Sequence, residues 1–126
     1  MKQWIILIVT LLLLLVCGLW EVNYLNKTSL YALSDIEYSE NLVENGNFKL
    51  AKEQLNSIDD SWNSIRPVWS IFIDHDEIGK IEERILDFKS NVEAEDKEES
   101  IKAAKELKRI FNHVVNKQRV NVSNVI

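Results

Sequence analysis

An almost unbroken apolar run, from Trp4 to Trp20, constrains this chain more than any other feature. Only Thr10 and Gly18 interrupt its isoleucine, leucine, valine and cysteine side chains. A helix of this length rises about 25 Å, close to the roughly 30 Å hydrocarbon thickness of a bilayer, and continuing it to Leu25 completes the span. Residues 1–25 are therefore predicted to form an N-terminal transmembrane anchor.

The flanks of the run predict its orientation. Trp4 lies at one end and Trp20 and Tyr24 at the other, where aromatic rings favour the membrane interfaces. Lys2 and the terminal amine carry the positive charge before the run, and Glu21 follows it. This bias places the N-terminus in the cytoplasm and residues 26–126 outside the cell membrane, as an extracytoplasmic domain of a single-pass protein.

Two alternatives for the run stay open. A cleaved signal peptide needs small residues after its apolar region, and Val16-Cys17-Gly18-Leu19-Trp20 lacks that arrangement. A bacterial lipoprotein would acylate Cys17, and Leu14-Leu15-Val16-Cys17 resembles the lipobox, although Val16 stands where that motif has a small residue. Both alternatives also export the rest of the chain, so the extracytoplasmic prediction does not depend on the choice.

The composition of the remaining chain predicts one small helical domain. The 126 residues include three glycines and one proline, a very low number of helix breakers. The one cysteine lies in the apolar run, so no internal disulfide is expected. All the acidic residues lie from Glu21 onward, which argues against nucleic acid or an anionic lipid surface as the main partner.

The apolar spacing predicts where the helices lie. Residues 21–44 are expected to continue the anchor helix or to begin a new one just after it, with a weak stripe that includes two serines. Asn45-Gly46 is a good helix stop, and Asn47 can cap the next helix.

A second helix follows over residues 48–72. Its apolar positions alternate in steps of three and four, the spacing of helix-on-helix packing, at Phe48, Ala51, Leu55, Ile58, Trp62, Ile65, Trp69 and Phe72. Pro67 predicts a kink near residues 63–67 rather than a break. Trp62 and Trp69 are interpreted as core side chains rather than as a ligand platform. A homodimer through this face is an open alternative.

A third helix is expected from about His75 to Glu93, and a fourth carries its inner stripe from Ile101 to Val114. Val120 to Ile126 alternates apolar and polar residues without caps and is expected to be an irregular tail. These patterns predict an all-α protein: an N-terminal transmembrane helix followed by an up-down bundle of three to four helices.

The densest polar cluster is Asp74-His75-Asp76-Glu77. Asp74 and Glu77 have the spacing of a capping box, which favours a solvated helix start. The alternative is a metal or small-ligand site of Asp74, His75 and Glu77, with His113 brought back toward it by an antiparallel fourth helix. The spacing is poor for a metal, because the residue four after His75 is Gly79.

The sequence lacks the patterns of catalysis and of cofactor binding. The one cysteine lies in the apolar run, no serine has the setting of a nucleophile elbow, and three scattered glycines cannot build a phosphate loop. We therefore expect no enzyme activity, no cofactor and no catalytic residue.

The chain also resembles a family of small bacterial membrane-anchored helical proteins catalogued as a domain of unknown function. The resemblance rests on Trp69, Phe72, an Asp-His-x-Glu-Ile motif that starts at Asp74, Ile81, and the ending Val122-Ser123-Asn124-Val125-Ile126. Gly79 departs from the acidic residue expected there. The resemblance implies a helical topology and no particular activity.

These observations lead to two expectations about function. The first is a non-enzymatic module that binds another envelope protein, associates with itself, or senses its surroundings. The alternative is the metal- or small-ligand-binding domain centred on Asp74, His75, Glu77 and His113.

Overall fold

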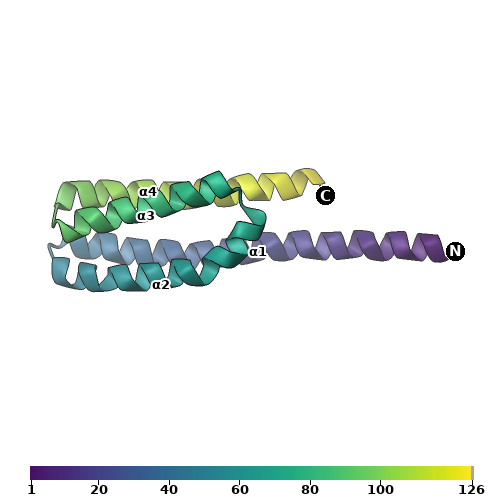
Figure 1. The fold of residues 1–126 in the computed structure, drawn as a ribbon, viewed down its shortest axis with the longest axis horizontal. Coiled ribbons are helices and arrows are strands. Elements are labelled where there is room, and N and C mark those ends of the chain that lie inside the picture. Colours follow the sequence, from purple (N-terminus) through teal and green to yellow (C-terminus); the bar gives the residue numbers. More distant parts are fainter. Residues whose placement is uncertain (126) are drawn as a thin grey trace.

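The described part of the chain is all-α. We use a computed structural model that describes the backbone of residues 1–125 and the side chains of residues 1–120. Over these residues it contains four helices (Figure 1): α1 (Lys2–Glu44), α2 (Phe48–Phe72), α3 (His75–Glu93) and α4 (Lys97–Val125). The predicted fold class is confirmed.

The four helices form an up-down bundle in which each helix packs against two neighbours. α1 contacts α2 and α4, and α3 also contacts α2 and α4, so the bundle closes on itself. Short turns make chain neighbours antiparallel, and the α1–α2 and α3–α4 turns lie at the end of the bundle far from the N-terminus (Figure 1). We call this the distal end, and we call the end that carries the α2–α3 turn the basal end.

α1 is one uninterrupted helix of 43 residues that joins the apolar run to the bundle. Its first turns project beyond all the other helices (Figure 1), and every side chain from Lys2 to Cys17 is exposed. The first buried residue is Leu25, and the weak stripe then lies inward, with Ser29 and Ser39 buried beside Ile36 and Val43. Residues 21–44 therefore continue the helix of the apolar run.

The apolar face of α2 supplies the centre of the core. Ala51, Leu55 and Ile58 are buried, and Trp62 and Trp69 pack edge-to-face against each other with ring centroids 5.8 Å apart. Phe111 of α4 meets both rings in the same geometry. The interpretation of both tryptophans as core residues is confirmed. Because this face is covered within the chain, it is not free to form the homodimer considered above.

α2 also continues through Pro67, as the sequence predicts. The ring removes one backbone donor, and the last turns of α2 swing toward α3 (Figure 1). Packing of Trp69 and Ile73 into the core holds these turns in place.

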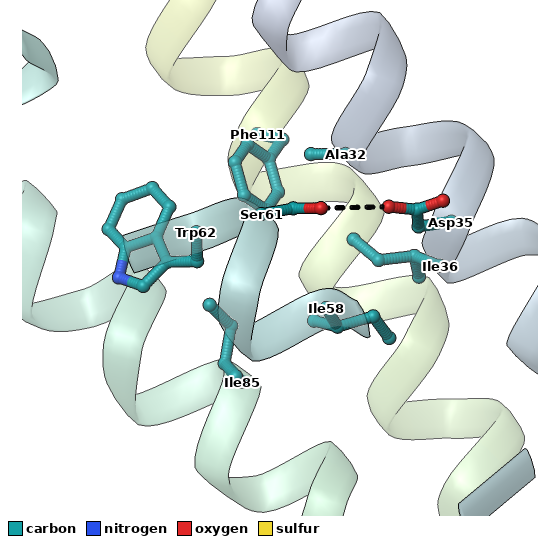
Figure 2. A pocket seen from close by; sticks show the side chains of 8 residues that line it. All are labelled: Ala32, Asp35, Ile36, Ile58, Ser61, Trp62, Ile85 and Phe111. Carbon is teal, nitrogen blue, oxygen red and sulfur yellow. Dashed lines mark hydrogen bonds between the residues drawn. The ribbon is translucent and has the colours of Figure 1, made fainter. Parts of the chain in front are cut away.

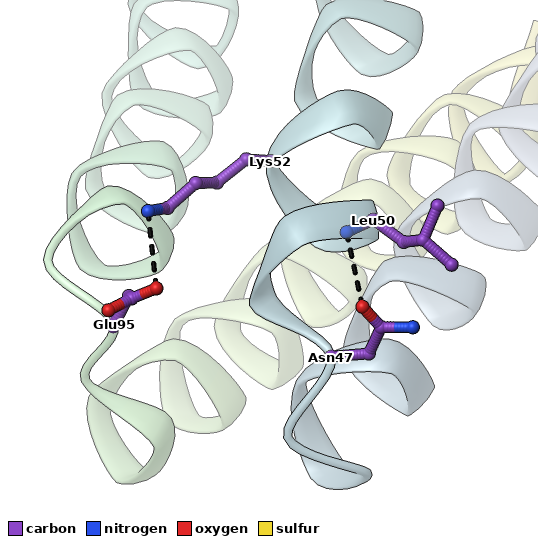
Figure 3. Close-up of polar contacts among 4 residues, drawn as sticks. All are labelled: Asn47, Leu50, Lys52 and Glu95. Carbon is purple, nitrogen blue, oxygen red and sulfur yellow. Dashed lines mark hydrogen bonds and ion pairs between the residues drawn. The ribbon is translucent and has the colours of Figure 1, made fainter.

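The two distal turns end their helices in the left-handed conformation. Gly46 has φ +75°, and the amide of Asn47 reaches back to the carbonyl of Leu42. The side chain of Asn47 accepts from the amide of Leu50 at 3.3 Å and caps α2 as predicted (Figure 3). At the other turn Glu95 has φ 58°, and its carboxylate pairs with Lys52 of α2 at 3.3 Å (Figure 3).

The C-terminal residues differ from prediction. The expected irregular tail is wrong for residues 120–125, because α4 runs to Val125; Ile126 lies outside the described residues. Two contacts join α4 to α1 just before this segment: Gln118 donates to Glu21, and Arg119 donates to Asn26 at 2.9 Å. Such tertiary contacts outweigh the weak helix propensity of a valine- and asparagine-rich segment.

Candidate functional site

The polar cluster from Asp74 to Glu77 opens α3 at the basal end. Asp74 occupies the N-cap position, but its side chain makes no capping bond there. The carboxylate of Glu77 reaches across to α4 instead and accepts from the ammonium of Lys117 at 3.1 Å. The predicted capping box is therefore wrong, because a cation on the neighbouring helix attracts Glu77 more strongly than a neutral backbone amide does.

Lys117 is held in its charged form by this contact. The hydrogen bond that Lys117 donates to Glu77 and the negative charge of Glu77 raise the pKa of Lys117; burial opposes this, and the charge of Asp74 adds a smaller contribution. The cluster therefore contributes an inter-helix ion pair between α3 and α4.

His113 lies at a different level of the bundle from that pair. It lines a surface depression of about 280 Å³ between α3 and α4, beside Lys80, Arg84, Glu106 and Arg109. Because the two helices are antiparallel and Lys117 is level with Glu77, a residue one turn earlier in α4 falls level with later residues of α3. Three lining residues are cationic, and the carboxylate of Glu106 is paired with Arg109, so the surroundings of His113 disfavour a metal cation.

The four candidate ligands are consequently distributed over two places. Asp74, His75 and Glu77 stay at the start of α3, where Glu77 is engaged by Lys117, and His113 lies in the depression. Among the described side chains, no three histidine, cysteine, aspartate or glutamate residues gather in a way that can hold a metal ion.

The sequence patterns did not predict two polar contacts inside the bundle. The indole N–H of Trp69 donates to the hydroxyl of Thr28 at 2.8 Å. Glu40 is buried on α1, and its carboxylate lies 2.6 Å from the ammonium of Lys108 on α4. The signal for Glu40 was its spacing, four residues after Ile36 and three before Val43, which places a carboxylate at the edge of the buried stripe.

A small cavity lies beside the aromatic cluster. Its lining includes Ile36, Ile58, Trp62 and Phe111, and one edge is closed by a 3.2 Å hydrogen bond from Ser61 to Asp35 (Figure 2). Its volume of about 10 Å³ is near the minimum for a single water molecule, so it cannot hold an organic ligand.

The outer side of α1 carries large exposed side chains above the apolar run. Leu30 and Tyr31 are each 66% exposed and Tyr38 is 49% exposed. Tyr31 and Tyr38 are seven residues apart, so they lie on one face of the helix, and half-buried Tyr24 precedes them by the same interval. We call Leu30, Tyr31 and Tyr38 the α1 outer patch.

Comparison with known proteins identifies one family. A family model described as a domain of unknown function, DUF4363, matches residues 19–125. The match covers the whole bundle and begins at the end of the apolar run. No curated protein and no solved structure matches the chain significantly.

Proposed function

The chain belongs to the DUF4363 family, and from its structure we propose that it is a membrane-anchored, extracytoplasmic helical module that binds another membrane protein and has no catalytic role. The family description carries no activity, so the proposal rests on the bundle itself.

The observation that carries the proposal is the continuity of α1. The apolar run ends at Trp20, and five residues later Leu25 is buried in the core without a break in the helix. An anchor joined to its domain by a flexible linker lets the domain tumble, whereas a continuous helix fixes the orientation of the domain. A displacement of the bundle by a partner would therefore be transmitted to the membrane segment, as a sensing role requires.

Exposure along the run supports a membrane environment for it. The helix α1 is long and apolar enough to cross a membrane, and its most apolar stretch has no residue buried inside the bundle. The core does not need these side chains, and a bare apolar helix of this length is not stable in water. A bilayer is the environment that covers it.

The α1 outer patch supplies the proposed contact surface. Tyrosine is enriched at protein interfaces because it buries a large ring at low entropic cost while its hydroxyl stays hydrogen-bonded. Tyr31 and Tyr38 continue the line of α1 away from the membrane, so a helix packed along them would itself rise from the bilayer. The partner we propose is therefore a second membrane protein that presents such a helix.

Site-specific photo-cross-linking in cells tests this proposal. A photoreactive amino acid replaces Tyr31 or Tyr38 in the full chain, and Glu53, exposed on α2, serves as the control position. We expect one discrete adduct with a membrane protein from both tyrosine positions and none from position 53. Leu30→Lys should abolish the adduct at position 38 and leave the helical circular dichroism unchanged. Cross-links to lipid alone, or equal adducts at all three positions, would overturn the proposed surface.

A further inference from the structure

The basal end of the bundle is shaped by two helices that extend past the other two. α1 and α4 both continue beyond the α2–α3 turn (Figure 1). The contact of Gln118 with Glu21 sets their relative level, and α4 continues from Gln118 to Val125. Those seven residues rise about 10 Å, so the end of α4 is level with the C-terminal third of the apolar run.

Large apolar side chains are exposed at this same level. Ile71 is 74% exposed, Val120 57% and Trp20 51%. Phe72, next to Ile71, packs edge-on against Trp20 with ring centroids 6.0 Å apart. This contact places the end of α2 against α1 where the apolar run ends. We call Trp20, Ile71 and Val120 the basal collar. It comes from three different helices at the level where α1 leaves the bundle.

We propose that the basal collar is a second membrane contact, on which the bundle rests against the outer leaflet while the last turns of α4 lie beside α1 in the headgroup region. The inference rests on the proposed anchor. A lipid surface is the occupant because the collar is continuous with the apolar run: when α1 spans the bilayer, the leaflet begins at the level of Trp20.

The charges at this end indicate which lipids the collar accepts. At the basal end Glu21, Asp74, Asp76 and Glu77 outnumber Lys117 and Arg119, so this end offers no cationic surface to anionic headgroups. The contact is therefore apolar in origin and does not select anionic headgroups. The collar contact keeps the bundle axis perpendicular to the membrane. The rise of α1 from Glu21 to Glu44 then places the distal end about 35 Å from the membrane.

Depth measurements on the full chain in vesicles test the contact. In a Cys17→Ser background, an environment-sensitive fluorophore is attached at Ile71→Cys or Val120→Cys. Leu86→Cys, at an exposed leucine in the middle of α3, is the matched control, and Leu12→Cys reports on the anchor. Vesicles of phosphatidylcholine alone and with phosphatidylglycerol are compared.

We expect blue-shifted emission and quenching by lipid-attached quenchers at positions 71 and 120 in both lipid mixtures, independent of salt, and water-like emission at position 86. Water-like emission at 71 and 120, together with deep burial at position 12, would overturn the collar and leave the anchor intact. Water-like emission at position 12 as well would overturn both. A signal at 71 and 120 that requires phosphatidylglycerol would contradict the apolar origin of the contact.

Discussion

At the scale of single residues, the two core tryptophans differ in whether the buried indole N–H has a hydrogen-bond acceptor. Trp69 is fully buried, and its indole N–H donates to Thr28. Trp62 is 5% exposed, and among the described atoms its indole nitrogen has no hydrogen-bond partner; it points away from the Ser61–Asp35 bond (Figure 2). A buried donor without an acceptor costs stability, so the two rings should respond differently to the same substitution.

Trp69→Phe should lower the free energy of unfolding by about 1 kcal/mol more than Trp62→Phe, because it leaves Thr28 without its donor, whereas Trp62→Phe removes an unpaired polar group. Both changes lose a similar ring volume, so each is the packing control of the other. Urea unfolding of the full chain in detergent, followed by circular dichroism, measures the difference. Equal losses, or a larger loss for Trp62→Phe, would contradict the assignment of the Thr28 hydrogen bond.

Glu40 and Lys108 provide a second residue-scale prediction. Lys108→Met leaves a buried carboxylate without its cation and should lower the free energy of unfolding by about 1–3 kcal/mol, less than for a fully buried pair because Lys108 stays partly exposed. Lys105→Met, at an exposed position on the same helix, should change it by less than about 0.5 kcal/mol. Adding Glu40→Gln to Lys108→Met should restore part of the loss. Equal effects of the two lysine substitutions would show that the Glu40–Lys108 pair contributes nothing to the free energy of unfolding.

At the scale of elements, periodicity predicted the helices well because each apolar stripe is covered by the bundle. The 48–72 face, the Asn47 cap and the stop at Gly46 depend on local geometry and were readable in the sequence. The capping box at Asp74 and the tail at Val120 were not, because each is decided by a distant residue: Lys117 draws Glu77 away, and α1 supports the end of α4. Pairings across helices follow from the register of packing, which a single sequence does not reveal.

Two glycines test the helix assignments at this scale. Gly46 has φ +75° and Gly79 lies within α3, and an added methyl group would meet no atom within 4 Å at either place. Gly46→Ala should therefore lower the free energy of unfolding by about 1 kcal/mol through backbone strain alone. Gly79→Ala should raise it by about 0.5–1 kcal/mol by restricting the unfolded chain. A loss at both positions would contradict the helical assignment of Gly79.

At the scale of the whole molecule, the single helix α1 joins the proposed membrane anchor to the folded bundle. α1 contributes its N-terminal half to the proposed anchor and its C-terminal half to the core, and the basal collar adds a proposed contact where the two meet. The proposed site residues did not converge on a metal centre, whereas exposed apolar groups gather along α1 and around its exit from the bundle. The placement of these apolar groups supports the proposed contacts with a membrane and a partner.

The most direct measurement is the accessibility of the distal end in intact cells. Glu98→Cys places a thiol at the exposed start of α4, in a Cys17→Ser background that also removes the residue a lipoprotein would acylate. A membrane-impermeant maleimide should label this cysteine before the cells are broken, and the labelled chain should stay in the membrane fraction at its full mass. Labelling only after lysis, or release of a shortened or unanchored chain into the medium, would contradict a retained anchor that carries the bundle outside the membrane.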